Sequence, residues 1–313
     1  MFSWYQWDVK WFHVEQHDFL FKAKDELVSK EEFNIYWSKD NDYAVTELPK
    51  STILENYYKS EKYSSHKILK KSPLDFIYAL VQKLMLYYKK SFIVKRQDYY
   101  VLDYGSGVGV FANFLKKRGF SIKTVEPNKG ARNECLKKEL ECYKSIDYLP
   151  KERFYSSITL WHVLEHIPDL KRVLVKLYSK LQQEGDLIIA VPNLNSYDAK
   201  HYKSDWAALD VPRHLWHFTD SGIIKLVEKS GFIHISNHPL WFDAFYISYK
   251  SEAQKRSSFP FLKGLMVGFW SNLKAINNGQ YSSKIYVFKK TNLLEALFIK
   301  RVNCNPSSAK TIF

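Results

Sequence analysis

The chain has 313 residues, of which 46% are hydrophobic, so it is long and apolar enough to bury the core of one large domain or two modest ones. Lysine and arginine outnumber aspartate and glutamate by 47 to 33, and the net charge of +14 favours an anionic partner such as a phosphorylated substrate, nucleic acid or a membrane surface. The three cysteines have neither metal-ligand nor redox spacing, which excludes a disulfide framework and a four-cysteine zinc site.

The first residues, MFSWYQWDVKWF, lack the basic start, apolar stretch and cleavage site of a secretory signal. No segment reaches the roughly 18 uninterrupted apolar residues that a membrane span requires. The basic residues occur as scattered short groups, which favours a solvated surface over a single binding block. We therefore expect a cytoplasmic protein with reduced thiols and no DNA partner.

The first sixty residues predict a small β-rich module. Around EEFNIYWSKDNDYAVTEL, two β-leaning runs flank the turn-forming residues 40–42, a pattern that indicates a hairpin. From Ser72 onward, apolar residues recur at spacings of three and four, as on one face of a helix. We therefore divide the chain into a module at 1–60, a helical connector at 61–98, a main domain at 99–290 and a tail at 291–313.

In the main domain, short β-rich runs alternate with helical patterns. We expect strands at 99–103, 121–126, 157–161, 186–192, 231–235 and 283–289, and helices at 111–117, 129–140, 168–185 and 219–229. Pro168 is expected in the first turn of its helix, Gly185 at that helix's end, and Thr219 as the cap of the last helix. This alternation predicts an α/β fold with a parallel sheet covered by helices on both faces.

The stretch VLDYGSGVGVFANFL (101–115) joins the first of these strands to its helix through a glycine turn. Such a turn at the carboxyl end of a parallel strand lets the backbone approach a ligand closely. A dinucleotide fingerprint would need Gly or Ala where the chain has Val110, and no acid two residues before the first glycine. Asp103 at that position, with Glu126 ending the next strand, favours a nucleoside ligand that is positively charged or zwitterionic.

With these residues the chain resembles the class I S-adenosylmethionine-dependent methyltransferases, whose first motif is an acid followed by GxGxG. The segments WHVLEHIPD (161–169), LQQEGDLIIAVPN (181–193) and DVPRHLWHFT (210–219) are similar to the branch that contains ubiquinone-pathway O-methyltransferases. The resemblance implies a Rossmann-like, doubly wound, mostly parallel seven-stranded sheet with helices on both faces. It also implies an antiparallel last strand and S-adenosylmethionine as the cofactor.

Roles for particular residues follow from the same resemblance. Asp103 would lie near the amino group of S-adenosylmethionine and Glu126 at its ribose. The remaining candidate cofactor-binding residues are Gly105, Ser106, Gly107, Gly109, Pro127 and His162. Where the family places an aspartate near the start of its fourth strand, this chain has Ser156, a departure that affects the fine positioning of the donor.

Histidines are the candidate general bases, because methyl transfer to a hydroxyl needs a proton acceptor and histidine titrates near neutrality. We select His166, His214 and His217 as catalytic candidates, with helix capping as the structural alternative for His166. The sequence HVLEH imitates the metalloprotease pattern HExxH, but its glutamate is misplaced for that helix geometry. We therefore expect no metal site.

A polar and aromatic cluster follows the fifth strand. Trp206, Asp210 and Arg213 are the candidate acceptor-binding residues, since an arginine beside aromatic rings can orient a ring or an anionic group. In the structural alternative, Asp210 and Arg213 form a salt bridge within a lid. Both interpretations stay open at this point.

Two other segments have less specific patterns. FPFLKGLMVGFWSNL (259–273) is strongly apolar, and core packing is its favoured interpretation over a pocket cap, a subunit contact or a peripheral membrane contact. KDELVSKEEFNIYWSKDNDYAVTELP resembles a zinc ribbon without its cysteines, because Ser38 and Asn41 stand where the second pair would be. We expect a metal-free remnant there, and the tail at 291–313 has no informative motif.

The leading hypothesis is therefore an S-adenosylmethionine-dependent methyltransferase that acts on a small or lipid-linked acceptor, most often at oxygen in this branch. An anionic acceptor would suit the positive net charge. The alternatives are an RNA or protein methyltransferase, and a non-catalytic protein that has kept the S-adenosylmethionine fold. The identity of the acceptor and the oligomeric state are left open.

Overall fold

The computed structural model describes residues 17–49, 52–58, 73–93, 100–152 and 154–291, with side chains of the first helix from residue 79 onward. Three predicted segments therefore lie wholly or partly outside the described residues. They are the start of the N-terminal module, the first part of the connector and the C-terminal tail from residue 292.

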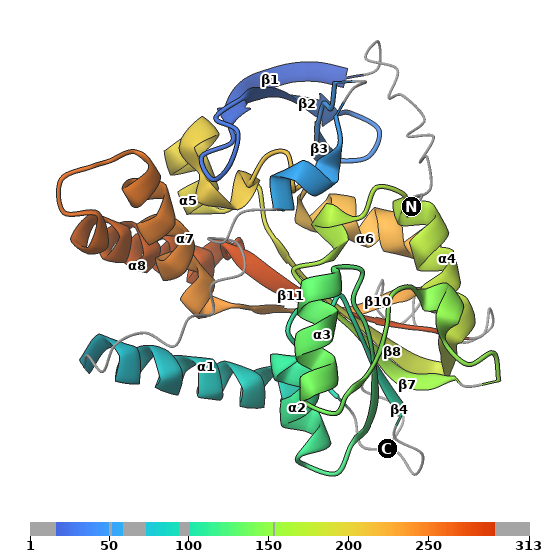
Figure 1. Cartoon of the computed structure of the whole chain (residues 1–313). Helices are drawn as coiled ribbons and strands as arrows, with labels where there is room; N and C mark the ends of the chain where they lie inside the picture. The colour runs from blue at the N-terminus through green and yellow to red at the C-terminus, as the bar shows by residue number, and fades with distance from the viewer. Residues whose placement is uncertain (1–16, 50–51, 59–72, 94–99, 153, 292–313) are drawn as a thin grey trace, which may run out of the picture.

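A twisted seven-stranded sheet forms the centre of the molecule (Figure 1). From edge to edge its strands are β10 (Ile233–Pro239), β11 (Ser283–Lys289), β8 (Leu181–Pro192), β7 (Tyr155–Trp161), β4 (Tyr100–Tyr104), β5 (Ser121–Val125) and β6 (Glu141–Tyr143). The run from β8 to β6 is parallel, and β11 is antiparallel to both of its neighbours. The predicted Rossmann-like architecture is confirmed, and β6, which is only three residues long, is the strand that the sequence did not indicate.

Helices cover both faces of this sheet because successive strand residues point to opposite sides. Val101 of β4 packs with α1 (Pro73–Ser91) and α2 (Val110–Lys116), whereas the next residue, Leu102, belongs to the core cluster under α4 (Leu170–Lys180) and α6 (Asp220–Glu228). Helix α3 (Lys129–Lys137) packs beside α2 through Cys135. The glycine turn that joins β4 to α2 is thus held between two filled layers.

Two predicted features of α4 are wrong. The helix begins at Leu170, after Asp169, whose carboxylate accepts the Arg172 N–H at 3.0 Å and so caps the first turn in place of Pro168. It ends at Lys180, and β8 begins at once, so Gly185 lies inside a strand. A Cβ on Gly185 would lie 2.8 Å from Leu181 Cγ, which accounts for the glycine there. The predicted Thr219 cap of α6 is confirmed by its bond from the Gly222 N–H.

A second, four-stranded antiparallel sheet lies above the first (Figure 1). Its strands are β1 (His17–Lys24), β2 (Glu32–Ser38), β3 (Tyr43–Thr46) and β9 (Trp216–Phe218). The predicted hairpin is confirmed, with its turn at residues 39–42. Because β9 comes from the loop after β8, the N-terminal strands and the main domain share one sheet.

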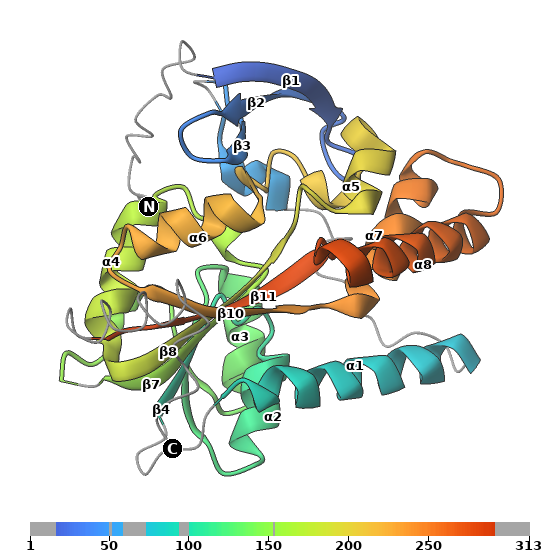
Figure 2. The same cartoon turned by 180° about the vertical axis from the view of Figure 1, so that it is seen from behind.

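Two long helices, α7 (Trp241–Gln254) and α8 (Pro260–Asn278), form a hairpin that extends past the central sheet on the same side as α1 (Figures 1 and 2). The short helix α5 (Tyr197–Tyr202) joins it to the second sheet. Asp198 accepts hydrogen bonds from Ser271 Oγ of α8 at 2.6 Å and from Trp206 Nε1 at 2.7 Å, and Trp206 belongs to a core cluster with residues of β2. The hairpin is therefore fixed to the domain at its base.

A buried ion pair connects the N-terminal strands to the loop before β9. The Arg213 guanidinium is 1% exposed and donates to Asp25 Oδ1 at 2.9 Å and to Asp210 Oδ1 at 2.7 Å. Asp25 follows β1 and also accepts the Ser29 N–H at 2.8 Å. Burial alone would raise the pKa of Asp25, but the Ser29 and Arg213 hydrogen bonds hold it below its ordinary value, so this carboxyl is ionised at neutral pH.

Replacing Arg213 by alanine is expected to lower the free energy of unfolding by about 3–5 kcal/mol, because it leaves the Asp25 carboxylate buried without its cation. Urea denaturation followed by circular dichroism measures the loss. Since the pKa of Asp25 lies below 3.8, the contribution of the pair is present above that pH and disappears on further acidification.

The matched control is Lys39→Ala, which removes an ion pair to Asp18 on the same sheet. Its side chains are 65% and 58% exposed, so the expected cost is under about 1 kcal/mol. Equal losses of unfolding free energy in the two variants would show that the buried Arg213 pair stabilises the protein no more than an exposed ion pair does.

Candidate active site

Three glycines shape the turn between β4 and α2. Gly105, Gly107 and Gly109 all have left-handed backbone angles, with φ of 74°, 54° and 75°. A Cβ on Gly105 would lie 2.5 Å from the Val163 side chain, and one on Gly109 would lie 2.6 Å from Leu140. A Cβ on Gly107 would meet nothing within 4 Å. The outer glycines are thus needed for packing, and the space beside the middle one can admit a ligand.

Asp103, at the end of β4, is almost completely buried beside this turn. It is 2% exposed, and its Oδ1 accepts the Thr159 hydroxyl at 2.8 Å. Burial raises the pKa of Asp103 to about 6, against the opposing effects of Thr159 and Lys89. A buried carboxylate of this kind would gain from a cationic group of a ligand, and the role predicted for Asp103 stays a prediction.

Glu126, directly after β5, is hydrogen-bonded to the glycine turn after β4. Its Oε2 accepts the Gly107 N–H and its Oε1 accepts the Asn128 N–H, both at 2.8 Å. Each carboxylate oxygen can accept two hydrogen bonds, so each retains one position for a hydroxyl. The turn and its two acids therefore fit a nucleoside that carries a positive charge.

Lys89 of α1 adds a cation that sequence reasoning missed. Its ammonium lies 4.7 Å from the centre of the Trp161 ring and interacts with Asp103 and Asp243. Burial lowers the pKa of Lys89, while Asp243 and Asp103 oppose that shift. As one of a lysine pair it was interpreted as a solvated surface residue, and nothing in the sequence indicates that α1 returns to the end of β7.

His162 follows β7 with a left-handed φ of 54° and connects the site to α7. Its Nε2 lies 3.1 Å from Asp243 Oδ2, and its Nδ1 lies 3.5 Å from Glu165 Oε1. Burial would lower the pKa of His162, but the two carboxylates outweigh it and raise the pKa to about 9. His162 is therefore a cation at neutral pH, unsuited to act as a base.

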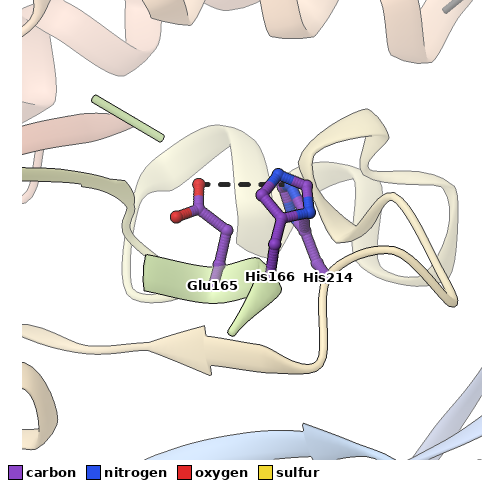
Figure 3. A group of neighbouring side chains, drawn as sticks. All are labelled: Glu165, His166 and His214. Atoms are coloured by element: carbon purple, nitrogen blue, oxygen red, sulfur yellow. Dashed lines mark ion pairs between the residues drawn. The ribbon is translucent and has the colours of Figure 1, made fainter. Parts of the chain in front are cut away.

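Glu165, His166 and His214 converge in one group (Figure 3). Glu165 is 1% exposed, and within the described part of the chain neither of its oxygens has a hydrogen-bond donor; its ion-pair partners are His162 and, at 4.0 Å, His214. The centroids of the two histidine rings lie 4.5 Å apart, and the rings meet edge to face. Glu165 is the second functional candidate that sequence reasoning missed, although its HVLEH context was noted.

Backbone carbonyls fix both rings of this group. His166 Nδ1 lies 3.0 Å from the Arg213 carbonyl, and His214 Nδ1 lies 2.8 Å from the Ala208 carbonyl. Since a carbonyl only accepts, each Nδ1 carries a proton, and in neutral His166 the Nε2 is then an acceptor. Burial and the neighbouring His214 lower the pKa of His166 to about 4, so it is neutral at pH 7.

The other predicted residues lie deeper in the protein. His217 is 4% exposed in β9, where its Nε2 lies 2.8 Å from Thr46 Oγ1, and burial lowers its pKa to about 3. Trp206 is 2% exposed within a core cluster. Together with Asp210 and Arg213 it lines a pocket of about 40 Å³, which has room for water but not for an organic acceptor. The salt-bridge alternative for Asp210 and Arg213 is observed.

The Glu165, His166 and His214 group also has the donor types of a divalent cation site. One oxygen and two nitrogens lie within 4.8 Å of one another. Only Glu165 and His166 belong to the HVLEH segment; His214 comes from the loop before β9. The expectation of no metal, which rested on HVLEH alone, stays a prediction.

Comparison with known proteins agrees with this geometry. A family model described as a methyltransferase domain matches residues 75–237, just over half of the chain. A ubiquinone biosynthesis O-methyltransferase of Coxiella burnetii (strain RSA 493) is 26% identical over 165 residues, which cover 45% of this chain and 68% of that protein.

Two solved structures are also similar to this chain. The StiE O-MT fragment 942–1257 has a TM-score of 0.50 and 13% identity, with 82% of this chain and 88% of that chain covered. Phosphoethanolamine N-methyltransferase 2 of Haemonchus contortus, solved with S-adenosylmethionine, has a TM-score of 0.49 and 15% identity. The match covers 87% of this chain and 71% of that chain. With the family match and a turn that fits a cationic nucleoside, the chain belongs to the methyltransferase-domain family, as a class I enzyme that uses S-adenosylmethionine.

Proposed function

We propose that this enzyme transfers the methyl group of S-adenosylmethionine to a hydroxyl of a small or lipid-linked acceptor. The observation that carries the choice of oxygen is the buried group of Glu165, His166 and His214 beside the glycine turn. Val163 lies in the loop that bears Glu165 and His166, and it packs directly against Gly105 of the glycine turn. The group therefore adjoins the donor site.

The charges around the turn suit the two ends of the donor. S-adenosylmethionine supplies, when bound, a methyl group already activated by a sulfonium. Asp103 would hold its amino group, and Lys89, whose charge acts on Asp103, would hold its carboxylate. Glu126 would accept the ribose hydroxyls at the positions that its backbone bonds leave available.

A hydroxyl must lose its proton as the methyl group arrives, whereas a neutral amine needs no base before attack. Neutral His166 has Nε2 as its acceptor and would take this proton. Burial and His214 disfavour the resulting imidazolium and keep the pKa of His166 at about 4. The ionised Glu165 opposes this shift and would stabilise the imidazolium in part, because its histidine neighbours lower its pKa although burial raises it.

The class of acceptor is inferred from two sources. The Coxiella burnetii relative is named for O-methylation in ubiquinone biosynthesis, which supports a small or lipid-linked molecule as the acceptor. Exposed apolar residues on α1 and α7, near the site, would suit a hydrophobic molecule. RNA and protein acceptors remain the alternative.

Asp103→Asn is expected to weaken S-adenosylmethionine binding by about ten- to a hundredfold, the cost of one charged hydrogen bond. The amide keeps the bond from Thr159, and the fold should be no less stable, because burial disfavours the ionised form of Asp103. Isothermal titration calorimetry gives the affinity, and thermal unfolding of the unliganded protein gives the stability.

The pH dependence provides the control. With a pKa of about 6, Asp103 becomes neutral as pH falls through that value, so wild-type affinity should drop by up to about tenfold for each further pH unit. The Asn variant should lack this component. Equal affinities of the two proteins at alkaline pH would remove Asp103 from the donor site.

His166→Gln is expected to lower kcat by about 10²–10⁴-fold while leaving donor affinity unchanged, because it removes the proton acceptor but not the turn. The assay follows transfer of a labelled methyl group to a panel of phenolic and lipid-linked hydroxyl compounds. His201→Gln, which alters an exposed histidine of α5, is the matched control and should retain wild-type activity.

Two further arms separate the alternatives. Removal of divalent cations with a chelator should leave the rate unchanged if His166 acts as a base, and should abolish it if the group binds a metal. Efficient methylation of RNA or protein, with none of the small hydroxyl compounds, would reject the proposed acceptor class.

A further inference from the structure

The α7–α8 hairpin buries its smallest side chains. The buried residues of α8 are all small: Gly264, Gly268, Ser271 and Ala275. Val267 is partly buried and packs against the core cluster beside them. A Cβ on Gly264 would lie 2.5 Å from the Tyr249 Cα, and one on Gly268 would lie 2.7 Å from the Phe245 Cα. The two helices therefore touch at backbone distance, with no large side chains between them at these points.

The large apolar residues of α8 point outward instead. Eight of them are between 41% and 69% exposed, and we call them the outer row: Phe261, Leu262, Leu265, Met266, Phe269, Trp270, Leu273 and Ile276. Phe259 before the helix is 76% exposed, and Tyr246 of α7 is 55% exposed. The expectation of core packing for residues 259–273 is therefore wrong for the large residues of this segment.

This arrangement is unfavourable for a helix in water. Each large apolar side chain left exposed forgoes about 1.5–3 kcal/mol of burial. In lipid the preference is reversed, because small residues allow helices to approach closely while large apolar residues face hydrocarbon. None of the helices in the described ranges is long and apolar enough to cross a bilayer, so the outer row suits a helix that lies on one.

The charge of the hairpin favours an anionic membrane over a second copy of this chain as the partner of the outer row. Residues 253–279 contain Lys255, Arg256, Lys263 and Lys274 and no acidic residue. Lys255 shares an ion pair of 3.8 Å with the exposed Asp205. In a symmetric contact between two copies, this basic segment would face itself, whereas anionic headgroups would attract it.

We propose that the α7–α8 hairpin docks on an anionic membrane surface, with the outer row in the headgroup boundary and the basic residues at phosphate level. Helix α1 lies on the same side in both views and exposes Leu80 and Leu84 (Figures 1 and 2). The ring centroids of its Tyr88 and of Trp241 lie 5.2 Å apart, so the end of α1 contacts the start of α7.

The docked hairpin would place the site at the membrane. Asp243 of α7 contacts His162, and Lys89 of α1 contacts the Trp161 ring, so both helices begin or end at the donor site. A lipid-linked acceptor could then enter between them without leaving the bilayer. This second step rests on the proposed function, whereas the docking itself does not.

Co-sedimentation of the full chain with vesicles tests the docking, without donor or acceptor present. Vesicles of equimolar phosphatidylcholine and phosphatidylglycerol should bind the wild type at least about tenfold more strongly than phosphatidylcholine alone. The double variant Leu265→Asn, Phe269→Asn should lose at least about tenfold in binding to the mixed vesicles. Arg256→Gln, Lys263→Gln should lose the preference for phosphatidylglycerol.

Leu136→Asn, Val175→Asn is the matched control, since both residues are 53% exposed but lie on α3 and α4. It should bind vesicles like the wild type. Circular dichroism and donor titration verify that all variants are folded, so a failure of docking is distinguishable from a failure of methyl transfer. Sedimentation velocity showing a dimer that the outer-row variant dissociates, or a monomer that binds no vesicles, would overturn the proposal.

Discussion

One carboxylate sets the geometry of the donor end of this protein. Glu126 accepts the N–H groups of Gly107 and Asn128, and so fastens the turn after β4 to the end of β5. The two strands are parallel neighbours with Tyr104 opposite Val125, so their carboxyl ends meet at one level. Val163 rests against Gly105, so the turn also positions the loop that bears Glu165 and His166. One turn thereby connects the donor site to the loop of the proposed base.

Charges of alternating sign continue from this turn to the outer helices. Lys89 interacts with Asp103 and Asp243, and His162 lies between Asp243 and Glu165. Each of these groups is wholly or partly shielded from water, so their mutual influence is greater than it would be at a surface. A zwitterionic ligand that engages Lys89 and Asp103 therefore also changes the electrostatic balance at the base of α7.

The sequence predicted the central sheet well because its signals are local. Alternating strands and helices, the GSGVG turn and the two acids after neighbouring strands were sufficient for the fold, and they also indicated that the turn and the acids would lie together. The errors at Pro168 and Gly185 arose where an Asp169 cap and a close backbone approach decided the boundary. Both are contacts that periodicity does not report.

The parts that sequence reasoning missed depend on contacts between distant segments. Lys89 reaches the site from a helix that precedes β4, and Asp25 pairs with Arg213 across 188 positions. For Arg213 the sequence left acceptor binding and a salt bridge to Asp210 open, because its second partner, Asp25 after β1, is not visible in the sequence. The outer row on α8 was assigned to the core because apolar composition alone does not show which side of a helix faces outward.

The shared sheet also has a consequence for the order of folding. Strand β3 pairs with β9, and Thr46 Oγ1 donates to the His214 carbonyl, 168 residues further along the chain. During synthesis the β3 edge stays unpaired until most of the protein has emerged from the ribosome, and contacts of such long sequence separation form slowly. The loop that carries His214 can therefore take its final shape only after β9 has been synthesised, which makes the appearance of the complete candidate site a late event in folding.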